Sequence, residues 1–162
     1  MRWDAFEHAC PEIGQLARDR FTKDELVLVG TIRADGGPRI SPNEVDFVSG
    51  RLFISMMWQS KKALDLLRDP RAAMHSVPSD RMNPGGDVKL YGHVVDERDP
   101  EVREAFREEI RRRIDWAPDE PNYHCFSFDV ESAAFISFGQ DNSRLMVWDP
   151  ERGLRYPTHP DG

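Results

Sequence analysis

The spacing of apolar and polar positions divides the first third of the chain into helices followed by strands. Residues 2–21 have helical spacing, and Pro11 is predicted in the first turn of a second helical piece. The run ELVLVGTIRAD (25–35) changes to a β pattern that ends at Asp-Gly-Gly, a hairpin signal, and PRISPNEVDFV (38–48) returns as a second strand. Pro42 within it indicates a sheet edge or a bulge.

The rest of the chain alternates between the two patterns. RLFISMM (51–57) is predicted as a third strand, and Gly92 marks a bulge or close approach in a later one. A loop is predicted over 78–87, and the apolar stripe of 99–115 predicts the clearest helix. Further elements are a short helix over 60–69 and strands over 71–77, 88–97, 123–139 and 144–149.

This order of elements indicates one domain with a mainly antiparallel sheet. The turns between the first three strands are too short for parallel crossovers, so a doubly wound sheet is disfavoured. We therefore expect an α+β fold, a small β-barrel with flanking helices. The single domain spans 1–162, with a core over about 25–149 and an irregular tail over 150–162.

Composition and charge narrow the functional classes. The 162 residues carry a net charge of −7, which argues against bulk attraction to nucleic acid or an anionic membrane. No stretch has membrane-spanning length, and the charged N-terminus does not have the pattern of a signal peptide. Cys10 and Cys125 form no CxxC pattern and are expected to be reduced thiols, so we expect a cytoplasmic protein.

Motifs of hydrolytic, nucleotide-binding and metal chemistry are missing from the sequence. It has no GxGxxG after a strand, no GxxxxGK[ST], no GxSxG and no HExxH. No two histidines have metal-ligand spacing, so no metal site is expected. The five histidines are His8, His75, His93, His124 and His159.

The helix over 60–69 begins with an unusual arrangement of charges. Ser60 is a good N-cap, yet Lys61 and Lys62 follow it in the first turn, where the helix dipole disfavours cations. The chain has only 4 lysines among its 22 basic residues, so two adjacent ones are unusual. Free backbone N–H groups and a positive dipole end suit a phosphate, and solvated surface lysines are the alternative.

The stretch from residue 30 to 77 resembles the central signature of the pyridoxamine 5'-phosphate oxidase-like split barrels, which bind FMN or a deazaflavin. The family pattern is a strand, an Asp-Gly turn, a return strand, a third strand, a Ser-Arg/Lys-Lys-Ala helix and then Leu-x-x-Asp-Pro-Arg. Here the helix has Ser60-Lys61-Lys62-Ala63, and Leu66-Leu67-Arg68-Asp69-Pro70-Arg71 follows.

The resemblance implies a six-stranded antiparallel split barrel that forms a homodimer with the cofactor at the interface. It implies FMN, or alternatively a deazaflavin coenzyme, and hydride transfer on an unknown small molecule, without a need for an acid/base residue. Lys61 and Lys62 would hold the phosphate. The other implied cofactor-binding residues are Arg39, Ser41, Asn43, Ser55, Met56, Trp58, Ser60 and Trp148.

The chain departs from the family at two places, and these leave alternatives open. Trp58-Gln59 stands where relatives often have a small residue, and the C-terminal Arg-x-His of true pyridoxamine phosphate oxidases is missing, so vitamin B6 oxidation is not expected. One alternative is a non-catalytic flavin carrier or sensor in which Trp58 covers the ring. Another is a haem-binding or haem-degrading relative with a histidine such as His159 as ligand, and the least supported is nucleic-acid binding through Arg111–Arg113.

Overall fold

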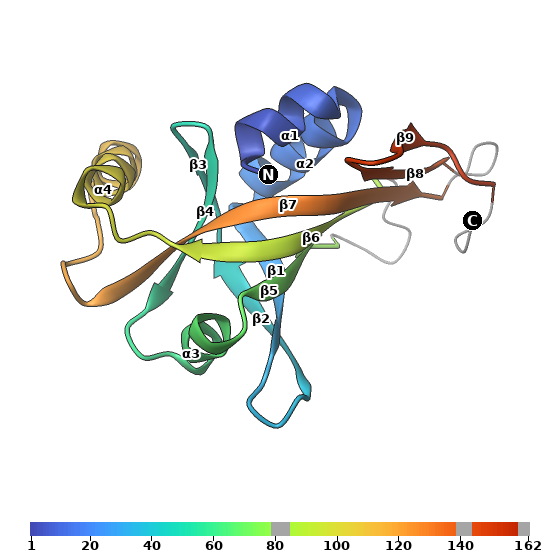
Figure 1. Ribbon diagram of the computed structural model, residues 1–162. Helices are drawn as coiled ribbons and strands as arrows, with labels where there is room; N and C mark the ends of the chain where they lie inside the picture. Colours follow the sequence, from blue (N-terminus) through green and yellow to red (C-terminus); the bar gives the residue numbers. More distant parts are fainter. Residues whose placement is uncertain (79–84, 139–143, 159–162) are drawn as a thin grey trace.

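A computed structural model of the protein describes residues 1–78, 85–138 and 144–158. These residues form four helices and a sheet of nine strands (Figure 1). The helices are α1 (Trp3–Ala9), α2 (Pro11–Asp24), α3 (Lys61–Arg68) and α4 (Pro100–Ile114). The strands are β1 (Leu26–Ile32), β2 (Pro38–Glu44), β3 (Asp46–Val48), β4 (Arg51–Met57), β5 (Arg71–Ser76), β6 (Asp87–Asp96), β7 (Tyr123–Ser137), β8 (Arg144–Asp149) and β9 (Gly153–Arg155).

The sheet is antiparallel and curved, and no ladder among the described residues joins its two end strands. Its strand order is β2-β1-β5-β6-β7-β4-β3, with β8 paired to β7 and β9 to β8. The first and last strands of this order, β2 and β3, are separated in sequence by Val45 alone. The Asn43 Nδ2 amide on β2 donates to the Ser55 carbonyl oxygen on β4 at 3.1 Å, across the gap between the ends. The α+β split barrel is therefore confirmed, with more strands than the six that the resemblance implies.

Two hydrophobic clusters hold the elements together. The larger one fills the barrel, where inward residues of β1 such as Val27 and Val29 meet Phe6 and Phe21 from α1 and α2. In the smaller one, Phe106 of α4 packs on the outer side of β4. In Figure 1, α1 and α2 lie over one side of the curved sheet, whereas α3 and α4 lie away from them.

Cys10 and Cys125 are both buried and form no disulfide, as expected. None of the helices in the described part of the chain has the length and apolar character needed to cross a membrane.

Local sequence signals at two positions are confirmed. Pro42 lies on β2, whose ladder within the described residues runs to β1 alone, so the missing N–H falls at a sheet edge. Gly92 lies at a register shift between β6 and β7, where a Cβ atom would come within 1.9 Å of the Asp129 carbonyl oxygen. No larger residue fits this bulge without moving β7.

Two expectations about the strands differ from the structure. The single return strand predicted over 38–48 is two strands, because the chain turns at Val45, whose buried side chain belongs to the core. The segment 150–162 was expected to be irregular, but it contains β9, which pairs with β8. A three-residue strand is too short to give a periodic pattern, so its pairing partner alone reveals it.

Candidate functional site

The start of α3 carries polar groups that the protein itself leaves unpaired. Ser60 is the N-cap residue, but its side chain makes no capping hydrogen bond. Its Oγ is buried and has no hydrogen-bond partner among the described residues. The first N–H groups of a helix have no partner within that helix, and they lie beside this hydroxyl. A buried hydroxyl next to free N–H groups suits an anion that accepts from all of them.

The two lysines that follow Ser60 differ in their surroundings. Lys61 is exposed, whereas Lys62 is half-buried and its Nζ donates to the Pro42 carbonyl oxygen at 2.8 Å. Burial lowers the pKa of Lys62, against the opposing effect of the Glu44 carboxylate. An ammonium group has three donors, so a Lys62 that bonds one carbonyl retains donors for an anion.

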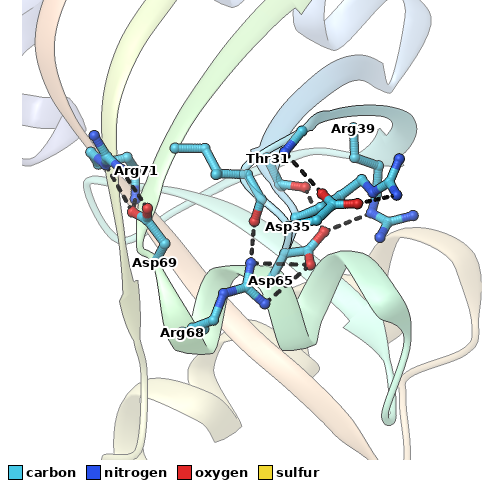
Figure 2. Close-up of polar contacts among 10 residues, drawn as sticks. Thr31, Asp35, Arg39, Asp65, Arg68, Asp69 and Arg71 are labelled. Carbon is cyan, nitrogen blue, oxygen red and sulfur yellow. Dashed lines mark hydrogen bonds and ion pairs between the residues drawn. The ribbon is translucent and has the colours of Figure 1, made fainter.

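Asp65 fixes α3 against the β1–β2 hairpin, as Figure 2 shows. Its Oδ2 accepts from Arg39 Nε at 2.6 Å and from Thr31 Oγ1 at 3.1 Å, and its Oδ1 pairs with Arg68 at 3.3 Å. Arg68 also donates to the carbonyl of Ile32. Burial alone would raise the pKa of Asp65, but the hydrogen bonds from Arg39 and Thr31 leave this pKa below its ordinary value. The carboxylate is therefore charged at neutral pH and holds the helix in place.

The predicted residues on β2 share one face. Arg39, Ser41 and Asn43 alternate with exposed residues, and the ladder sets Ser41 and Asn43 opposite Val29 and Val27 of the core. Arg39 is bound to Asp65 of α3, whereas Asn43 donates to the backbone carbonyls of Glu44 and Ser55 and so connects β2 to β4.

The two predicted residues on β4 point to opposite faces of the sheet. Met56 is 3% exposed and belongs to the barrel core. Ser55 is half-buried and lines a cavity of about 180 Å³ beside Glu44, Asp46 and Arg113. Their alternation is the ordinary consequence of strand geometry, and the sequence alone left open which of the two would face a ligand.

The turn before α3 is held by a residue that sequence reasoning did not select. Gln59 adopts a left-handed conformation with φ of 56°, and its backbone N–H donates to His124 Nε2 at 3.1 Å. The Trp58 ring stacks on the His124 imidazole, with centroids 4.7 Å apart and planes at 13°. Trp58 therefore lines a separate cavity of about 410 Å³ along with His124 and Tyr123.

Trp148 is not brought to the start of α3. It is 3% exposed on β8, inside the barrel core, where its ring packs edge-on against Phe6 at 5.0 Å.

The described residues contain no group of three or more His, Cys, Asp or Glu side chains arranged to hold a metal ion. His159, the expected haem ligand of one alternative, lies outside the described residues.

The structure shows a split barrel in which the start of α3, with the unpartnered Ser60 hydroxyl and two lysines, lies next to the β1–β2 hairpin. A sequence profile described as pyridoxamine 5'-phosphate oxidase matches residues 13–137, more than half of the chain. The chain belongs to the pyridoxamine 5'-phosphate oxidase family.

Solved structures of low sequence identity share this fold. A pyridoxamine 5'-phosphate oxidase-related, FMN-binding protein from Nostoc punctiforme has a TM-score of 0.68 at 13% identity, over 91% of this chain and 94% of that one. PhzG from Burkholderia lata, in complex with tetrahydrophenazine-1-carboxylic acid, has a TM-score of 0.67 at 14% identity, over 92% and 91%.

A haem-binding protein from Mycobacterium smegmatis is also similar, with a TM-score of 0.67 at 17% identity over 87% of this chain. This chain spans only 59% of the length of that protein. Comparison with curated protein sequences gave no match. Proteins of this fold thus include an FMN binder and a haem binder.

Proposed function

We propose that the protein binds FMN, or alternatively a deazaflavin coenzyme, with the cofactor phosphate at the start of α3, and that it is an oxidoreductase acting on a small molecule. The observation that carries the proposal is the buried, unpaired Oγ of Ser60 beside the first-turn cations Lys61 and Lys62. Two lysines in the first turn oppose the helix dipole, and a bound phosphate dianion reverses that penalty. The FMN-binding protein of the same fold supports this choice of cofactor.

The residues present fit such a phosphate group. Ser60 Oγ and the first N–H groups of α3 would donate to it, and Lys61 and Lys62 would neutralise its charge. The Asp65 network keeps α3 fixed while the ligand binds. A bound flavin supplies hydride-transfer chemistry, so the protein has to position substrate and exclude water. This requirement is consistent with a site built from positioning residues rather than an acid/base pair.

We propose that a second copy of the chain covers the outer face of β2, β1, β5 and β6. The ladders align Ile40, Gly30, Ala73 and Tyr91 in one row across these four strands. Gly30 and Ala73 leave an apolar hollow of about 310 Å³ between Ile40, 73% exposed, and Tyr91, 46% exposed. Two large apolar side chains beside such a hollow indicate an interaction surface. The family resemblance is the reason to propose a homodimer with the cofactor near this surface. We also propose a cytoplasmic location.

Titration of the purified protein with FMN and with a deazaflavin coenzyme, followed by tryptophan fluorescence, tests the proposed cofactor. We expect tight binding of one of them, and at least tenfold weaker binding by the Lys61→Ala/Lys62→Ala variant, about 1.4 kcal/mol. Light scattering of the Ile40→Arg variant tests the dimer. Ile114→Arg on α4 is the control, because it makes an equally large change at another exposed apolar residue. The cofactor proposal is wrong if neither compound binds, and the dimer surface is wrong if Ile40→Arg keeps the size of the unmodified protein.

A non-catalytic flavin carrier and a haem-binding protein are the alternative functions. The haem-binding protein of the same fold favours the second. Bound flavin that hydride donors fail to reduce would indicate a carrier. A Soret band on addition of haem, lost in His159→Ala, would indicate haem binding through that residue.

A further inference from the structure

Gln59 and Trp58, the residues that precede Ser60, are both in contact with one histidine. His124 on β7 accepts the Gln59 N–H through Nε2 at 3.1 Å, and its ring lies parallel to the Trp58 ring at 4.7 Å. A second stacking contact, at 5.9 Å to Phe126, fixes the imidazole from its own strand. His124 is 5% exposed, so its ring has little freedom to leave this position.

We propose that His124 is a positioning residue for the cofactor-phosphate site, which holds the turn before Ser60 only while its imidazole is neutral. The inference rests on the proposed function, because it concerns the same helix start. Gln59 directly precedes Ser60, so a rotation of the Gln59 backbone displaces the Ser60 hydroxyl and the first N–H groups of α3. Gln59 is held in the left-handed region, where φ is 56° and side chains other than glycine are disfavoured. The bond to His124 opposes the return of this residue to an ordinary conformation.

The protonation state of His124 decides whether the bond exists. An imidazole nitrogen that accepts from a backbone N–H carries no hydrogen, so the neutral ring has its proton on Nδ1. In the imidazolium both nitrogens are donors, and Nε2 then faces the Gln59 N–H donor to donor. Protonation of His124 therefore removes the bond and releases the turn.

The charged groups around His124 come from several elements. Asp96 on β6, Arg98 beyond its end, Arg103 on α4 and Glu120 before β7 line the same cavity. The turn and α3 face this cavity with Trp58, Gln59 and Leu67, which do not titrate. Burial lowers the pKa of His124, with Asp96 opposing this effect and Arg103 adding to it. The ring is thus neutral at pH 7 and above, and it becomes charged only below its ordinary value of 6.5.

The decisive experiment compares FMN affinity at pH 8 and at an acidic pH where NMR shows the His124 imidazole to be charged, in the unmodified protein and in His124→Gln. A glutamine side chain supplies an oxygen acceptor that does not titrate. The FMN phosphate itself loses charge near pH 6, and because both proteins bind the same ligand, their affinity ratio cancels this effect. We expect equal affinities at pH 8 and about fivefold weaker binding by the unmodified protein once His124 is charged, the size of one lost hydrogen bond.

Two further variants separate the hydrogen bond from the stacking contact. His124→Phe keeps a ring against Trp58 but has no acceptor, so it should already bind FMN weakly at pH 8. His8→Gln changes an exposed histidine on α1 and should behave as the unmodified protein. Equal pH profiles for the unmodified protein and His124→Gln would overturn the proposal.

An NMR titration keeps the test independent of FMN. The Gln59 amide resonance should shift with the same midpoint as the His124 imidazole and should lose that step in His124→Gln. If FMN fails to bind but Gln59 follows His124, the positioning of the turn stands and the proposed cofactor is wrong. If the Gln59 amide resonance does not shift when His124 titrates, the inference is wrong, whether or not FMN binds.

Discussion

Helices α3 and α4 begin in opposite ways. At α4 the Asp99 carboxylate accepts the Glu101 N–H at 2.9 Å, a proline occupies the first turn and an acidic residue faces the dipole. At α3 the Ser60 hydroxyl caps nothing, the first turn has no acidic residue, and two lysines stand in its place. The start of α4 has its own cap, whereas the start of α3 has no side-chain cap among the described residues. Within one chain, the difference is the basis on which we propose that α3, unlike α4, binds a ligand.

The largest effect should come from releasing α3 altogether. Asp65→Ala leaves Arg39, Arg68 and Thr31 without their common acceptor. Asp65 is buried but both arginines are partly exposed to water, so the loss should be about 2 kcal/mol of unfolding free energy. Urea titration at pH 7 measures this loss. Glu109→Ala on α4 removes an exposed pair with Arg112 and should leave the midpoint unchanged. Equal midpoints for the two variants would show that Asp65 does not hold the helix.

Acid should remove the same contribution. Because the folded-state pKa of Asp65 lies below its ordinary value of 3.8, its charge stabilises the fold above that pH, and this stabilisation is lost as pH falls through the lowered pKa. The difference in unfolding free energy between the unmodified protein and Asp65→Ala should therefore shrink below pH 3.8. A difference between the two proteins that stays constant down to pH 2 would contradict this assignment.

The two N-caps should respond differently to alanine. Asp99→Ala removes a formed capping bond and should lower the free energy of unfolding by about 1 kcal/mol, with no effect on FMN affinity. Ser60→Ala removes a hydroxyl that bonds nothing in the structure, so its cost should fall clearly below about 1 kcal/mol while FMN binds more weakly. Thermal melts and FMN titrations of both variants measure the two quantities. Equal costs and equal FMN affinities would remove the contrast between the helices.

The smallest effect should have the opposite sign. Lys61 is exposed in the first turn of α3, where a cation is unfavourable, so Lys61→Ala should stabilise the FMN-free protein by about 0.5 kcal/mol. The same change should weaken FMN binding. The control is Lys23→Ala, which removes the same charge in the last turn of α2, where the helix dipole favours a lysine. This change should not stabilise the protein. If Lys61→Ala destabilises the FMN-free protein, Lys61 has a structural role.

The parts of the molecule that the sequence predicts are those with short-range signals. The Asp-Gly turn, the edge position of Pro42 and the boundaries of α3 and α4 all depend on residues within a few positions of one another. The unusual start of α3 was visible for the same reason, because Ser60, Lys61 and Lys62 are adjacent.

The parts that escaped prediction depend on contacts between distant residues. Gln59 and His124 are 65 positions apart, and nothing near His124 marks it as an acceptor for a turn. Trp58 stays a predicted cofactor-binding residue, but the stacking of its ring on the same histidine was not predicted. Trp148 was selected by its place in the last strand, and only the packing of α1 shows that it belongs to the core.

The two buried thiols make this chain convenient for site-specific labelling. Burial raises the pKa of Cys125 to about 12 and also raises that of Cys10, so neither is a reactive thiolate at pH 8. A cysteine placed at Ala34, in the exposed turn of the β1–β2 hairpin, would then be the preferred point of attachment for a spin label. Pulsed electron paramagnetic resonance on that single-site derivative would yield one interlabel distance if two copies associate and none if the chain stays alone.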